Sequence, residues 1–87
     1  MRKEVTDAEI SIGLKEVGYK LNRRLEEKGR HGYITSHEVL GIITEEYWEL
    51  VDAVHKNDLT GILKECLDIA VAGLFAYISI LFKKIEW

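Results

Sequence analysis

Four acidic side chains of this 87-residue chain are spaced so that they could bind a metal ion. Glu46 and Glu49 form one pair three residues apart, and Glu65 and Asp68 form a second pair. Residues three apart on an α-helix are separated by about 60° around its axis, so each pair would direct its oxygens toward a shared point. Two antiparallel helices could bring the four carboxylates together. They would repel one another and raise one another's pKa values unless a hard cation such as Mg²⁺ lay among them.

The residues around these acids are mostly apolar. In the region 36–55 the apolar positions follow the period of a helix: Val39, Ile43, Leu50 and Val54. Glu46 stands between this apolar centre and an acidic flank, which places it toward the core. Glu65 and Asp68 likewise interrupt the apolar segment 59–82. Because burial of an unpaired carboxylate costs several kcal/mol, this placement favours a functional role.

Two other interpretations of the acids remain open. Acidic residues at spacings of three and four also arise on the exposed faces of small helical proteins, where they only keep the protein in solution. A di-iron carboxylate bundle would use inward acids too, but it needs Glu-x-x-His on two helices. Here Asp52 and His55 have a comparable spacing, and the aspartate side chain is short, so di-iron chemistry is the weaker interpretation.

Helix-capping patterns divide the chain into helical segments. Thr6 and Glu9 form a capping box, so a first helix is expected to begin near Asp7, and Gly29 is a suitable stop. The apolar residues of this helix recur with its period and predict its buried side: Ile10, Leu14, Val17, Leu21 and Leu25.

The same pattern recurs later in the chain. Thr35 and Glu38 form a second capping box, which predicts a helix over Ser36–His55. Asn57 or Asp58 can cap a third helix that is expected to extend to Lys84. Since no long stretch alternates apolar and polar residues, we expect an all-α fold with one domain over residues 1–87.

Composition excludes several classes of protein. A net charge of −3 and a pI near 5.6 give no general attraction to nucleic acid or anionic lipid. The longest uncharged run, Ile69–Phe82, has 14 residues, whereas a membrane-spanning helix needs about 20. The charged start of the chain does not resemble a secretory signal, so a cytoplasmic location is expected. Cys66, the single cysteine, is interpreted as a small buried side chain rather than a nucleophile.

The acids lie within a pattern that resembles a known family. Glu45-Glu46-Tyr47-Trp48-Glu49, followed after 15 residues by Glu65-Cys66-Leu67-Asp68, resembles the EExxE…ExxD signature of MazG-like nucleotide pyrophosphohydrolases, the all-α NTP pyrophosphatase superfamily. The resemblance covers about Ser36 to Gly73, including the helix-loop-helix context. It implies hydrolysis of a nucleoside triphosphate, or a related nucleotide, to the monophosphate and pyrophosphate.

The family resemblance also implies roles for individual residues. Glu46, Glu49, Glu65 and Asp68 would be the ligands of Mg²⁺, for which Mn²⁺ could substitute. Glu45 would be an accessory acid near the metal, and either Glu45 or Glu49 would orient the attacking water as general base.

This sequence departs from the family in its cations. Many members carry basic and amide residues after the ExxD segment that hold the phosphates. Here the nearest later cations, Lys83 and Lys84, lie about 22 Å along the helix from Asp68, too far to serve the same site within one subunit. Phosphate contacts are therefore expected from elsewhere, either from a second subunit or from these residues: Arg23, Arg24, Lys56 and Lys64.

Several rings near the second helix could stack on a nucleobase: Tyr33, Trp48, His31 and His37. A structural role is the stronger interpretation for each of them. For Trp48 we expect packing against the first helix or against a partner subunit, and for the two histidines we expect polar loop and first-turn positions.

The fold expected from these observations is a three-helix, MazG-like bundle completed by homo-oligomerisation, as a dimer or tetramer. The third helix should supply the interface, because its apolar residues surround the helix axis. The predicted function is Mg²⁺-dependent hydrolysis of a nucleotide, of house-cleaning type, with no nucleic-acid or membrane partner. The alternative is a non-catalytic helical oligomerisation or interaction module.

Overall fold

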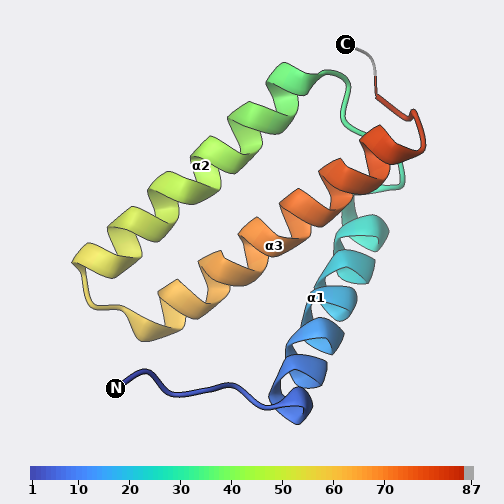
Figure 1. Cartoon of the computed structure of the whole chain (residues 1–87). Coiled ribbons are helices and arrows are strands. Elements are labelled where there is room, and N and C mark those ends of the chain that lie inside the picture. The colour runs from blue at the N-terminus through green and yellow to red at the C-terminus, as the bar shows by residue number, and fades with distance from the viewer. Residues whose placement is uncertain (86–87) are drawn as a thin grey trace.

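The computed structural model describes residues 1–85 and contains three α-helices (Figure 1). They are α1 (Asp7–Lys28), α2 (Ser36–His55) and α3 (Leu59–Leu81). No strand occurs between residues 1 and 85, so the expected all-helical fold with three helices is confirmed. Within the same residues, no helix is long and apolar enough to cross a membrane.

The helix starts follow the capping residues identified in the sequence. The Thr6 hydroxyl accepts a hydrogen bond from the Glu9 backbone N–H, and the Glu9 carboxylate accepts one from the Thr6 N–H. Thr35 caps α2 through the Glu38 N–H, but the Glu38 carboxylate accepts from Ile34 rather than from Thr35, so this capping box is incomplete.

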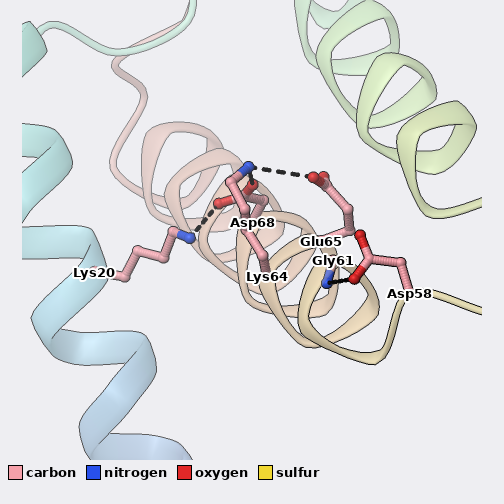
Figure 2. Close-up of polar contacts among 6 residues, drawn as sticks. All are labelled: Lys20, Asp58, Gly61, Lys64, Glu65 and Asp68. Atoms are coloured by element: carbon pink, nitrogen blue, oxygen red, sulfur yellow. Dashed lines mark hydrogen bonds and ion pairs between the residues drawn. The ribbon is translucent and has the colours of Figure 1, made fainter. Parts of the chain in front are cut away.

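The third helix begins as expected and ends earlier than expected. Of the two predicted caps, Asp58 is the one used, and its carboxylate accepts from the Gly61 N–H (Figure 2). The helix ends at Leu81 rather than at Lys84. Lys83 takes a left-handed conformation, with φ of 57°, which a continuing right-handed helix does not allow.

Helix α3 is central, because it packs against both of the other helices. In Figure 1, α2 and α3 run antiparallel, joined by a short loop, and α1 lies against α3 at an inclination. No Cα atom of α1 lies within 8 Å of a Cα atom of α2. The α2–α3 hairpin is therefore the scaffold, and α1 is attached to it through α3 and through the loop 29–35.

A small core lies where that loop meets the end of α3. Tyr33, only 3% exposed, packs edge-on against Phe75 with ring centroids 5.1 Å apart. Ala76 is also buried there, and half-buried side chains surround the cluster: Leu21, Leu25, Val39, Ile42 and Ile85. The loop can approach the chain after α3 because Gly32 has no side chain; a Cβ atom there would overlap the Lys84 carbonyl oxygen.

The buried side predicted for the first helix is only partly correct. Leu21 and Leu25 pack against the core, and Val17 is half-buried, but Ile10 and Leu14 are exposed and no residue of α1 is fully buried. The reason is that α1 diverges from the hairpin. Two residues of the hairpin were also expected to be buried and are exposed: Val54 of α2 and Cys66 of α3.

Candidate metal centre

Three of the four predicted metal ligands meet between α2 and α3. One carboxylate oxygen each from Glu46, Glu49 and Glu65 lies within 4.8 Å of the others. Glu65 is buried, with 7% of its surface exposed, while Glu46 is half-buried and Glu49 is exposed. The antiparallel hairpin produces this meeting, because it places a turn of α2 beside a turn of α3. We call these three residues the acidic triad.

Two oxygens of the triad lack hydrogen-bond partners. Glu46 Oε2 and Glu65 Oε2 are both inaccessible to solvent, and neither accepts a hydrogen bond from the described residues. Buried polar atoms are normally paired, since desolvating one without a partner costs free energy. A cation would compensate these oxygens. Two oxygens on opposite sides of one Mg²⁺ lie about 4.2 Å apart, so a small side-chain movement would bring the triad within its coordination range.

The protonation equilibria of the triad reflect mutual repulsion. Burial, followed by the neighbouring carboxylates with Glu65 first, raises the pKa of Glu46 to about 7. The Glu65 carboxylate also raises the pKa of Glu49, mainly because the two acids favour sharing a proton. Without a metal, the triad therefore retains protons at a pH where isolated glutamates have lost theirs.

Asp68, the fourth predicted ligand, is occupied by lysines. Its Oδ1 lies 2.5 Å from Lys20 Nζ of α1, and its Oδ2 lies 3.0 Å from Lys64 Nζ. Lys64 also contacts Glu65 Oε1 at 3.2 Å, so it links the aspartate to the triad (Figure 2). The structure thus brings three of the four acids together and pairs the fourth with cations; the role of Asp68 as a ligand stays a prediction.

The ion pairs shift the pKa of Asp68 in the opposite direction to the pKa values of Glu46 and Glu49. Burial alone would raise the pKa of Asp68, but the Lys20 and Lys64 ammonium groups outweigh burial and hold it below the ordinary value. Hydrogen bonding to Asp68, and then to Glu65, raises the pKa of Lys64. Asp68 therefore stays ionised to a lower pH than an isolated aspartate.

The triad lies between two hollows of the surface. Glu49 and Glu65 line an open pocket of about 660 Å³ between α2 and α3, together with these residues: Glu45, Trp48, Asp52, Ala53, Lys56, Asp58, Gly61 and Lys64. Glu46 instead lines a smaller pocket between α1 and α3. Glu45, the predicted accessory acid, is exposed at the larger pocket, and its role as a base stays a prediction.

The cations expected to contact phosphate divide between these pockets. Lys56 and Lys64 line the larger one, and Arg23 and Arg24 line the smaller one. Sequence reasoning missed Lys20 and Lys28, which also line the smaller pocket. Their spacing contained a signal, because residues 20, 24 and 28 are four apart and share one side of a helix.

The aromatic residues give a mixed result. Tyr33 is enclosed in the core, so it is not available to stack on a nucleobase. Trp48 is 62% exposed and contacts Tyr47 edge-on at 5.6 Å between ring centroids. It does not pack against α1, contrary to one of the two expectations for it, because α1 and α2 are not in contact. His31 and His37 are exposed, as expected for polar positions.

No family model matches the chain, and no curated protein or solved structure is detectably similar to it.

Proposed function

We propose that this protein is a divalent-cation-dependent nucleotide pyrophosphohydrolase of the MazG-like type. The observation that carries the proposal is the acidic triad, whose two buried oxygens lack partners among the described residues. The EExxE…ExxD spacing supports the same function. The reaction would convert a nucleoside triphosphate, or a related nucleotide, to the monophosphate and pyrophosphate.

Each acidic residue has a defined role in this proposal. Glu46, Glu49 and Glu65 would hold Mg²⁺, or Mn²⁺ in its place, with Asp68 as the fourth predicted ligand. The bound cation supplies charge neutralisation at the phosphate oxygens and lowers the pKa of a bound water. Glu45 or Glu49 accepts a proton from the water as it attacks phosphorus. The anhydride bond between the α- and β-phosphates breaks as the water oxygen bonds to the α-phosphorus, and pyrophosphate leaves.

The direct test is incubation of the purified protein with a panel of nucleoside triphosphates and Mg²⁺. We expect pyrophosphate release from at least one nucleotide, and its abolition by Glu49→Gln and by Asp68→Asn. Glu26→Gln is the matched control, because Glu26 is an exposed acid outside the triad and outside both pockets. Activity that survives both substitutions in the predicted ligands would refute the proposed site.

The exposed side of α3 supports the homo-oligomer that we propose with this function. At spacings of three and four, α3 carries small or apolar residues that are all exposed: Leu59, Leu63, Cys66, Ala70, Leu74, Tyr77 and Leu81. We call this set the α3 stripe. A regular apolar stripe of this kind is typical of helices that pair with other helices. Because the opposite side of α3 already packs against α1 and α2, a second copy of the chain is the proposed occupant.

Leu74→Asp tests this interface, because it introduces a charge in the middle of the α3 stripe. We expect light scattering after size-exclusion chromatography to show an oligomer for the wild type and monomers or unfolded protein for the variant. Leu40→Asp is the control, an equivalent exchange at an exposed position of α2. An unchanged oligomer and an unchanged melting temperature for Leu74→Asp would rule out the α3 stripe as the interface.

The same stripe favours a second candidate function, a non-catalytic helical oligomerisation or interaction module. In that case the acids would bind a structural cation or only interact with solvent. The two functions separate in the nucleotide assay: an oligomer that neither binds Mg²⁺ nor turns over any nucleotide would be the module.

A further inference from the structure

The smaller pocket beside the triad is lined mainly by charged residues. It has a volume of about 170 Å³ and lies between α1 and α3. Four cations of α1 line it: Lys20, Arg23, Arg24 and Lys28. A water molecule occupies about 30 Å³ of the liquid, so the pocket has room for a small anion but not for a folded partner.

The acids of this pocket do not cancel its cations. Glu27, Glu46 and Asp68 also line it. Asp68 is already paired with Lys20 and Lys64, and Lys64 lies outside the lining. Glu46 is shared between this pocket and the acidic triad. Arg23, Arg24 and Lys28 form no ion pair within residues 1–85, so three unpaired α1 cations of the lining outnumber its two unpaired acids, Glu27 and Glu46.

Arg24 is held in place by the core. Its guanidinium carbon lies 4.0 Å from the centroid of the Phe75 ring and 5.4 Å from that of Tyr33. Both rings are buried, so the cation–π contacts fix the side chain of a half-buried arginine. A guanidinium group has five N–H donors in a planar fork, which matches two oxygens of a phosphate. Arg24 therefore loses little conformational freedom on binding such an anion.

We infer that this pocket is a binding site for a phosphate-type oxyanion, of which inorganic pyrophosphate is the simplest probe. Arg24 and Arg23 donate to its oxygens, and Lys28 and Lys20 add positive charge. The anion could be free or part of a nucleotide, because both present the same phosphate oxygens.

The position of the site also orients a nucleotide, in a step that rests on the proposed function. Glu46 lines this pocket and belongs to the acidic triad, so an anion bound here lies directly beside the proposed metal. The phosphates would then extend from the triad toward α1. The α1 cations would then supply the phosphate contacts from within one chain. They lie on the side of the triad away from Lys56 and from the larger pocket.

Binding of pyrophosphate to the metal-free protein tests the site independently of hydrolysis. Isothermal titration in EDTA at low salt should detect binding, and NMR should show amide shifts near residues 20–28 and 68–72. Arg23→Met and Arg24→Met should each weaken binding about tenfold, as expected for lost charge-assisted hydrogen bonds. Arg23 is exposed and makes no cation–π contact in the described chain, so its removal spares the core. Lys15→Met is the control, an equal change of charge at an exposed α1 position outside the pocket.

Each result has a definite meaning. Binding that Lys15→Met weakens as much as Arg23→Met does would show unspecific attraction and overturn the inference. Absence of binding without metal would overturn it as well, while Mg²⁺-dependent hydrolysis would leave the proposed function intact. Conversely, specific binding of pyrophosphate by a protein without nucleotide turnover would uphold the anion site and refute the enzyme.

Discussion

The α2–α3 hairpin and α1 carry opposite charges into the same region, but the molecule holds them in different ways. The hairpin contains seven of the buried residues, from Ala53 to Ser79, and the triad is built on it. Helix α1 contains no buried residue. It is joined to α3 by half-buried apolar side chains, by the Lys20–Asp68 ion pair and by the contact of Arg24 with Phe75.

This difference shows how one small chain can tolerate a group of acids. Burying carboxylates costs free energy, so they must be carried by the part of the fold with the most packing to offset it. Cations with long aliphatic stems can remain partly exposed and still reach the site. The acids are therefore placed by a packed scaffold and the cations by a helix that contains no buried residue.

The largest expected effect is on the free energy of unfolding, which should fall far more for a substitution in the hairpin than for one in α1. Phe75→Ala should lower the free energy of unfolding by about 3–5 kcal/mol, because it removes a buried ring that contacts Tyr33 and Arg24. Leu14→Ala on α1, where the side chain is 69% exposed, should change it by less than about 0.5 kcal/mol. Urea denaturation followed by circular dichroism measures both. Similar losses for the two variants would contradict the comparison.

Metal addition should act through the hairpin. Under the proposed function Mg²⁺ binds the folded triad, so saturation at about 100 times its dissociation constant should stabilise the wild type by about 2.7 kcal/mol relative to EDTA. Glu65→Gln should abolish this gain, since it removes the most buried ligand. Thermal denaturation with and without Mg²⁺ is the measurement, and Glu26→Gln, an exchange outside both pockets, should respond like the wild type. An equal gain for Glu65→Gln would place the metal elsewhere.

The stability of the metal-free protein should depend on pH, in a direction set by the acidic triad. The pKa of Glu46 rises from 4.5 to about 7 on folding, so between these values the folded protein holds a proton that the unfolded chain lacks. Stability should therefore fall as the pH rises from 5 to 8, by on the order of 1 kcal/mol after solvent screening of a half-buried group. The lowered pKa of Asp68 acts below 3.8, outside this range.

Urea unfolding in EDTA at several pH values measures this slope. Glu46→Gln should flatten it and stabilise the metal-free protein near pH 8, because an amide has no charge to bury. A stability that rises with pH across this range would show that the triad is already compensated.

The smallest effect concerns the attachment of α1. Lys20→Ala removes its ion pair with Asp68, and such pairs contribute at most about 1 kcal/mol. Global stability should change little, while hydrogen exchange of α1 amides should become faster than that of α2 amides. Lys56→Ala is the control, since its exposed partner Asp52 lies on the same helix. Equal acceleration in both helices would mean that the pair does not hold α1 specifically.

The helices and their limits were largely predictable because capping is local. Thr6, Thr35 and Asp58 each satisfy a backbone N–H within three residues, and the structure uses all three. The end of α3 was not predictable in this way. It depends on the chain turning at Lys83, where the Lys84 carbonyl oxygen meets Gly32, which lies in a loop 52 residues earlier.

The amino-acid sequence by itself determined the three helices and the i,i+3 spacing that directs each acidic pair to one side of its helix, since both depend on neighbours along the chain. Tertiary structure alone decided which acids meet. The antiparallel hairpin joins Glu46 and Glu49 to Glu65, whereas the crossing of α1 brings Lys20 to Asp68. The crossing also places the α1 cations beside the triad. It depends on packing around Phe75, between residues far apart in the sequence, and no local pattern encodes it.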